Sequence, residues 1–150
     1  MVKLNVGDKF PEIKGDTTKG ELSLSDYSGK NVVVYFYPKD NTPGCTKEAK
    51  SFRDYSGEFE NLDTEIVGIS TDSIKSHEKF AKKYDLDFTL LSDRDKSICN
   101  SCGVTGLMGM TAKRTTFLLD KEGLIRNIWE NVSVKGHAED VLSKIKELDL

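Results

Sequence analysis

The segment that most constrains the fold is the run Asn-Val-Val-Val-Tyr-Phe-Tyr at residues 31–37. After its first residue the run is continuously apolar, and its residues are β-branched or aromatic. Such a run predicts a strand that is covered on both faces, as in the centre of a parallel sheet. A second buried strand is expected at residues 65–70, which read Glu-Ile-Val-Gly-Ile-Ser. The chain therefore has to place other elements on both sides of a sheet.

Helical and strand patterns alternate along the rest of the chain. Ala49, Phe52, Tyr55 and Phe59 recur every three or four positions, which predicts a helix after the first strand. We further expect a hairpin within residues 13–24, a helix capped by residues 71–72, a strand at 88–91, a short helix at 93–102, two hairpin strands at 115–119 and 124–129, and a last helix at 136–148. This order predicts a thioredoxin-like α/β fold, in which a central mixed sheet has helices on both faces and a small N-terminal hairpin extension. We expect residues 1–150 to form one domain.

The charge pattern excludes several classes of partner. The net charge is −3, and 22 basic and 25 acidic residues are interspersed, so no basic stripe is available for nucleic acid. No segment approaches the ~18 apolar residues that a membrane span needs. The first residues lack the apolar core of a signal peptide, and three cysteines are too few for a secreted disulfide framework. We expect a cytoplasmic protein that binds neither nucleic acid nor membrane, with its thiols reduced.

The first helix is predicted to begin at a cysteine. With Thr42 as N-cap and Pro43 as the first helical residue, Cys45 falls in the first turn. There the unpaired backbone N–H groups and the helix dipole favour a thiolate, which is the nucleophilic form. Gly44 has no side chain and is expected to leave an open approach to the sulfur. The alternative is that Cys45 is a small buried hydrophobic residue, as many free cysteines are.

The pattern Pro38-x-x-x-Thr42-x-x-Cys45 resembles the peroxiredoxin active-site motif. The longer string at residues 42–49, Thr-Pro-Gly-Cys-Thr-Lys-Glu-Ala, resembles the bacterioferritin comigratory protein subgroup, also called peroxiredoxin Q. The resemblance covers nearly the whole chain and continues in order through residues 68–72, 88–93, 103–104 and 114–118.

The resemblance implies a thiol peroxidase in which each motif residue has a role. Cys45 would attack hydrogen peroxide or an organic hydroperoxide and become a sulfenic acid. The Thr42 hydroxyl would hold the peroxide, and Pro38 would shield the reacting atoms from water. Arg114 would keep Cys45 ionised and stabilise the developing charge, while Glu48 would steer the arginine. The resemblance also implies a thioredoxin or similar thiol as reductant, no cofactor or metal, and a monomer or weak homodimer.

The chain departs from this subgroup at the position five residues after Cys45. Many members have a second, resolving cysteine there, and this chain has Lys50. Cys99 or Cys102 could take that part, although a bridge to Cys45 would require local unwinding. Otherwise Cys45 is the only cysteine that takes part, and an external thiol reduces its sulfenic acid.

The pair Cys99-x-x-Cys102 also supports two rival hypotheses. It could make the chain a thiol-disulfide oxidoreductase, or it could bind zinc together with a histidine. Neither is preferred, because the pair comes late in a short helix and no second ligand pair has zinc spacing. Of the two histidines, we expect His77 to be structural and His137 to be solvated.

Overall fold

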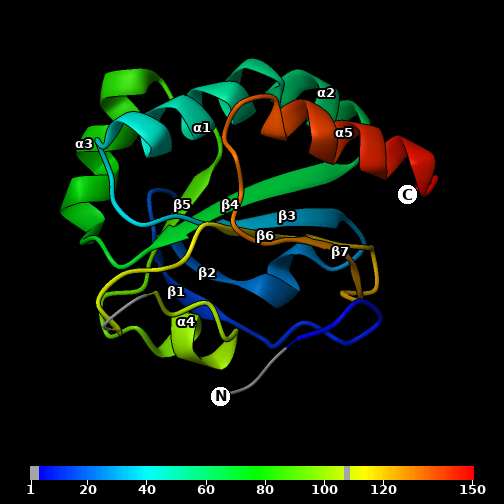
Figure 1. Ribbon diagram of the computed structural model, residues 1–150, viewed down its shortest axis with the longest axis horizontal. Coiled ribbons are helices and arrows are strands. Elements are labelled where there is room, and N and C mark those ends of the chain that lie inside the picture. The colour runs from blue at the N-terminus through cyan, green and yellow to red at the C-terminus, as the bar shows by residue number, and fades with distance from the viewer. Residues whose placement is uncertain (1–3, 107–108) are drawn as a thin grey trace.

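The computed structural model describes residues 4–106 and 109–150 (Figure 1). Within these residues one mixed sheet has the strand order β2-β1-β5-β4-β3-β6-β7. The strands are β1 (Lys14–Thr17), β2 (Gly20–Ser23), β3 (Asn31–Phe36), β4 (Thr64–Ser70), β5 (Thr89–Ser92), β6 (Thr115–Leu119) and β7 (Ile125–Trp129). The helices are η1 (Leu24–Tyr27), α1 (Pro43–Asp54), α2 (Ser56–Asn61), α3 (Ile74–Tyr84), α4 (Ser97–Ser101) and α5 (His137–Glu147). The predicted α/β, thioredoxin-like fold is confirmed.

Strand β3 is the centre of this sheet, as its continuous apolar run predicts. All six of its residues are buried. It pairs in parallel with β4 and antiparallel with β6, and its last residue, Phe36, lies opposite Thr115 at the start of β6. The end of β3 and the beginning of β6 are therefore neighbours, and both lie beside the start of α1.

The two faces of the sheet have separate hydrophobic cores. Alternate residues of β3 point to opposite faces, as the twofold period of a strand requires. Val33, Tyr35 and Tyr37 pack against α1, α2, α3 and α5, whereas Val32, Val34 and Phe36 pack with residues from α4 and the N-terminal segment. Figure 1 shows α1, α2, α3 and α5 on one side of the sheet and α4 on the other.

Three local predictions differ from the structure. The helix expected to run on to Phe59 is interrupted at Tyr55, so that α1 and α2 are separate helices. The N-cap of α3 is Ser73, whose side chain accepts a hydrogen bond from the backbone N–H of Ser76. The cap was expected at residues 71–72, and Asp72 instead accepts hydrogen bonds outside the helix. The N-terminal hairpin also joins the main sheet, since Thr17 pairs with Leu91.

None of the helices in the described residues is long and apolar enough to cross a membrane.

Two glycines allow a matched test of the packing between β4 and its neighbours. A Cβ atom at Gly68 would lie 2.8 Å from a ring atom of Tyr35 and 2.9 Å from Leu90 Cδ2, whereas a Cβ at Gly57 in α2 would meet nothing within 4 Å. We expect Gly68→Ala to lower the free energy of unfolding by ~1–3 kcal/mol, because the core is overpacked. Gly57→Ala should leave it unchanged or raise it by up to ~1 kcal/mol. Urea denaturation measures both, and equal effects would contradict the packing described here.

Candidate active site

The first turn of α1 carries Cys45. Thr42 is the N-cap residue and Pro43 the first residue of the helix, and the Thr46 N–H donates to the Thr42 carbonyl at 2.9 Å. Cys45 is therefore among the backbone N–H groups that the helix itself leaves without partners. The residue is only 1% exposed, so it is much less open to solvent than its place beside a hydrophilic loop suggests.

Arg114, from a distant part of the chain, contacts Cys45. It immediately precedes β6, and the antiparallel pairing of β6 with β3 brings it next to the start of α1. Its Nη2 atom donates to Cys45 Sγ at 3.3 Å, and its Nη1 atom donates to Glu48 Oε1 at 2.7 Å. Cys45 and Glu48 are three residues apart on one face of α1, so a single guanidinium spans both.

Glu48 is a buried carboxyl group with one oxygen unpartnered. The residue is 1% exposed, and burial raises the pKa of its carboxyl group from 4.5 to about 7, although Arg114 opposes the shift. Among the described residues, Glu48 Oε2 and the Tyr35 hydroxyl are two of three buried side-chain polar atoms with no hydrogen-bond partner. The pKa of Tyr35 is raised well above its usual value by burial and by the charges of Glu48 and Cys45. Unpaired polar atoms are costly in a core, and here they border the cysteine.

Thr42 does not cap α1 through its side chain. Its hydroxyl donates to the Lys39 carbonyl at 2.8 Å instead. The hydroxyl oxygen therefore keeps its acceptor capacity. Pro38 and Thr42 are half-buried in the loop between β3 and α1.

Gly44 lies against the guanidinium of Arg114. A Cβ atom at this position would lie 3.2 Å from Arg114 Nη2. The missing side chain therefore makes room for the guanidinium beside the sulfur.

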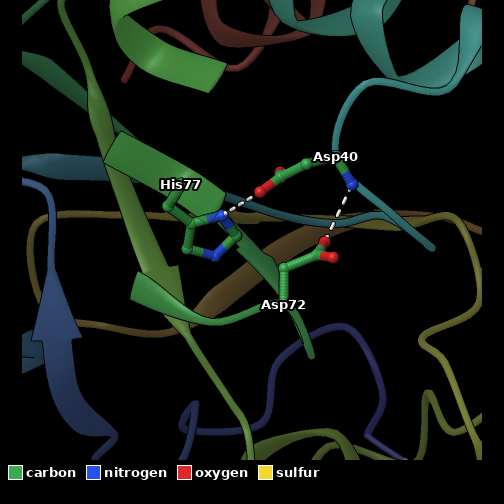
Figure 2. A group of neighbouring side chains, drawn as sticks. All are labelled: Asp40, Asp72 and His77. Carbon is green, nitrogen blue, oxygen red and sulfur yellow. Dashed lines mark hydrogen bonds and ion pairs between the residues drawn. The ribbon is translucent and has the colours of Figure 1, made fainter. Parts of the chain in front are cut away.

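The loop between β3 and α1 is held through Asp40, a residue that the sequence did not single out. Asp40 is buried, its backbone N–H donates to Asp72 Oδ2 at 2.8 Å, and its carboxylate lies 2.7 Å from His77 Nδ1 (Figure 2). His77 is fully buried in this group. No pattern marked Asp40, because an aspartate in a polar loop is ordinary, and Asp72 was expected only as a helix cap.

Cys99 and Cys102 lie on the opposite face of the sheet from Cys45. Cys45 belongs to the core on the α1 side, and the other two cysteines belong to the core on the α4 side. All three thiols are free and buried. Burial raises the pKa of Cys99 strongly, with a further contribution from Asp93, and burial raises the pKa of Cys102 to about 12. The structure therefore does not bring either candidate resolving cysteine to Cys45.

The prediction for His137 is wrong. The residue is 3% exposed, packs against Phe52 and Trp129, and shares a 2.8 Å hydrogen bond with the Thr116 hydroxyl. Burial lowers the pKa of its imidazole from 6.5 to about 4, so the ring is neutral at neutral pH. Its place at the start of a polar helix hid this burial, because the covering aromatic side chains come from distant segments.

The zinc hypothesis for Cys99 and Cys102 finds no support in the described part of the chain. There, the side chains grouped closely enough to hold a metal ion are Asp40, Asp72 and His77, and neither cysteine is among them.

Comparison with known proteins assigns the family. The model of the AhpC/TSA family matches residues 6–128. The chain belongs to the AhpC/TSA family. Among its relatives in this family, peroxiredoxin Bcp of Bacillus subtilis is 44% identical over 154 residues, which cover 97% of each chain.

Solved structures of AhpC/TSA proteins agree with this assignment. A cysteine-to-serine mutant of PrxQ from Xylella fastidiosa superimposes with a TM-score of 0.91 at 35% identity, covering 98% of each chain. The bacterioferritin comigratory protein of Xanthomonas campestris, whose structure is described in terms of alkyl peroxide reduction, gives a TM-score of 0.85 at 37% identity over 90% of each chain. The resemblance to peroxiredoxin Q is thus confirmed.

The raised pKa of Glu48 predicts how stability depends on pH. The unfolded chain releases the Glu48 proton near pH 4.5 and the folded chain near pH 7, so the folded state binds more protons in between. This residue therefore makes the free energy of unfolding fall as pH rises from about 4.5 to 7. Glu48→Gln removes the effect, so the unfolding free energy of the variant minus that of the wild type should rise across this range, by on the order of 2–3 kcal/mol.

Denaturant unfolding at several pH values measures this difference directly. His137 changes the pH dependence of the unfolding free energy in the opposite direction, because its pKa is lowered in the folded state. This contribution is the same in both proteins and cancels in the difference. Parallel curves for the two proteins would contradict the assignment of a buried, proton-binding carboxyl group.

Proposed function

We propose that this chain reduces hydroperoxides with Cys45 as the reacting thiol. The observation that carries the proposal is the 3.3 Å hydrogen bond from Arg114 to a sulfur in the first turn of α1. A cation and a helix N-terminus both stabilise a thiolate, which is the form that attacks. The relatives in the AhpC/TSA family are named peroxiredoxins, and this activity fits the site.

The reaction begins with an in-line displacement on the terminal oxygen of the peroxide. The Cys45 thiolate forms an S–O bond while the O–O bond breaks, so that the sulfur is oxidised to a sulfenic acid. The leaving alkoxide, or hydroxide for hydrogen peroxide, takes up a proton and departs as an alcohol or water.

Three further residues support this step. The Thr42 hydroxyl already donates to Lys39, so its oxygen is suited to accept a hydrogen bond from the peroxide O–H. Arg114 stabilises the negative charge that spreads from sulfur to the leaving oxygen, and Glu48 orients Arg114 through its second Nη atom. Pro38 contributes by limiting the access of water.

An external thiol then reduces the sulfenic acid. The seven-strand sheet separates Cys45 from Cys99 and Cys102, so an intramolecular disulfide would require extensive local unfolding. A thiolate from thioredoxin or a similar donor would attack the sulfenic sulfur, form a mixed disulfide and release water. A second thiol of the donor would then restore Cys45.

We further propose that residues 1–150 act as one domain in the cytoplasm, as a monomer or weak dimer. Three reduced thiols suit a reducing compartment. Among the described residues the exposed large hydrophobic side chains are Val6 and Met110, which is too little for an obligate interface.

Thiol-disulfide exchange by Cys99 and Cys102 is not favoured. Both thiols are buried, and the raised pKa values described above keep them protonated at neutral pH. A protonated thiol is a poor nucleophile.

Arg114→Ala should lower the rate of Cys45 oxidation by about 100-fold or more, because a fixed donor to the reacting atoms is lost. Stopped-flow peroxide consumption, or quenched mass spectrometry, measures this rate. Arg126→Ala is the matched control, since Arg126 pairs with Asp120 at the surface hairpin and should leave the rate within about twofold. Equal rates for the two variants would remove Arg114 from the mechanism.

Cys45→Ser should abolish peroxide turnover, because no other described thiol is placed to react. The double variant Cys99→Ser, Cys102→Ser should form the sulfenic acid at the wild-type rate. Intact mass spectrometry without reductant, after one equivalent of peroxide, distinguishes the routes. A gain of one oxygen on Cys45 supports the external thiol, and an intramolecular disulfide to Cys99 or Cys102 would refute it.

A further inference from the structure

A second buried group of polar side chains holds the loop that carries Pro38 and Thr42 (Figure 2). Its centre is the pair formed by Asp40, from this loop, and His77, from α3. The side chains of His77 and Asp40 are 0% and 3% exposed, and 2.7 Å separates His77 Nδ1 from Asp40 Oδ2. None of the roles assigned above to Cys45, Arg114 or Glu48 accounts for this pair.

The hydrogen-bond partners show how the pair is charged. His77 Nε2 lies 3.0 Å from the Leu91 carbonyl of β5, which can only accept, so this nitrogen carries a proton. Asp40 accepts from the Tyr37 hydroxyl at 2.6 Å on Oδ1 and from the Ser76 hydroxyl at 2.7 Å on Oδ2. A carboxyl group with these donors is best satisfied as a carboxylate, so Nδ1 also carries a proton. His77 is then an imidazolium paired with an ionised Asp40.

Tyr37, directly after β3, and Asp72, between β4 and α3, are titratable groups bonded to Asp40, and the buried Tyr35 hydroxyl of β3 also feels its charge. From β5, the Leu91 carbonyl meets His77. Asp40, Asp72 and His77 offer ligand atoms within 4.8 Å of one another, which could suit a metal ion. However, Asp72 Oδ2 already accepts from the Asp40 N–H at 2.8 Å and from the Ser70 hydroxyl at 2.6 Å. Protein donors thus already occupy Asp72 Oδ2 and both carboxylate oxygens of Asp40, which favours an ion pair of Asp40 and His77 over a metal site.

The ion pair fixes the middle of the reactive loop. Asp40 lies two residues after Pro38 and two residues before Thr42, and its backbone N–H and both carboxylate oxygens have partners outside the loop or at its base. The next residue, Asn41, has φ of 63°, a left-handed conformation that asparagine adopts more readily than most residues. Releasing Asp40 would free Thr42 and the start of α1 to move.

We propose that His77, as a buried imidazolium paired with Asp40, is a positioning residue that holds residues 38–42 in the conformation in which Cys45 reacts. His77 touches neither Cys45 nor Arg114 by any described hydrogen bond, and it acts through Asp40. The inference rests on the proposed function, because its consequence is the rate of Cys45 oxidation.

The first test is the protonation of His77 in the wild-type chain. Nitrogen-detected NMR of the two histidine rings separates the neutral form, with one protonated ring nitrogen, from the charged form, with two. His77 should show two protonated ring nitrogens, whereas His137, buried with its pKa lowered to about 4, is the neutral reference in the same spectrum. A neutral His77 ring would overturn the ion pair.

The second test is a double-mutant cycle on the rate of Cys45 oxidation, followed by quenched mass spectrometry. His77→Gln leaves a buried carboxylate without its cation, and Asp40→Asn leaves a buried imidazolium without its anion, so each should lower the rate by about 10-fold or more. The double variant His77→Gln, Asp40→Asn removes both charges and should react faster than either single variant. His137→Gln, at the buried histidine outside the loop, should stay within about twofold of wild type.

Wild-type rates for the single variants, or a double variant whose loss equals the product of the single losses, would overturn the positioning role. If a single variant fails to fold but the double variant folds, the coupling is supported directly. If wild-type Cys45 is not oxidised by peroxide at all, the proposed function fails, while the NMR spectrum still decides whether the ion pair exists.

Discussion

The candidate site depends on the hydrogen bond from the guanidinium of Arg114 to the sulfur of Cys45, two residues that are far apart in the sequence. Arg114 donates to both Cys45 and Glu48, and this requires β6 to pair antiparallel with β3 in the observed register. A shift of one residue would turn the side chains of β6 to the other face of the sheet. The pairing of β6 with β3 therefore underlies both the packing of the core and the geometry of the site.

Burial gives this arrangement its strength and its pH dependence. Cys45 and Glu48 are both almost fully buried, so the charge of Arg114 acts on them with little screening by water. The same burial raises the pKa of Glu48 to about 7, which leaves the carboxyl group close to half protonated near neutral pH. The protonation of Glu48, which shares Arg114 with Cys45, is therefore expected to depend on pH near neutrality.

Much of the fold could be predicted from the sequence, because long apolar runs and helix signals are local. The central strand at residues 31–37 and the helix that begins after Thr42 are examples. The position of Arg114 came only from the family resemblance, since nothing in its own strand indicates which residue it meets. The role of Asp40 was missed because its partner, His77, is 37 residues away in the sequence, and an aspartate in a loop is typical of a turn. His137 was misjudged for a similar reason, because Phe52 and Trp129 cover it only in the folded chain.

The sheet that divides the cysteines also affects how the protein responds to oxidative stress. Under the proposed mechanism the sulfenic acid has no neighbouring thiol in its own chain, so its lifetime is set by the arrival of an outside donor. A long-lived sulfenic acid can meet a second peroxide molecule and pass to the sulfinic acid, from which ordinary thiols cannot recover it. The resistance of such a protein to a peroxide burst then depends on the ratio of thiol donor to peroxide around it. A prolonged excess of peroxide inactivates the enzyme.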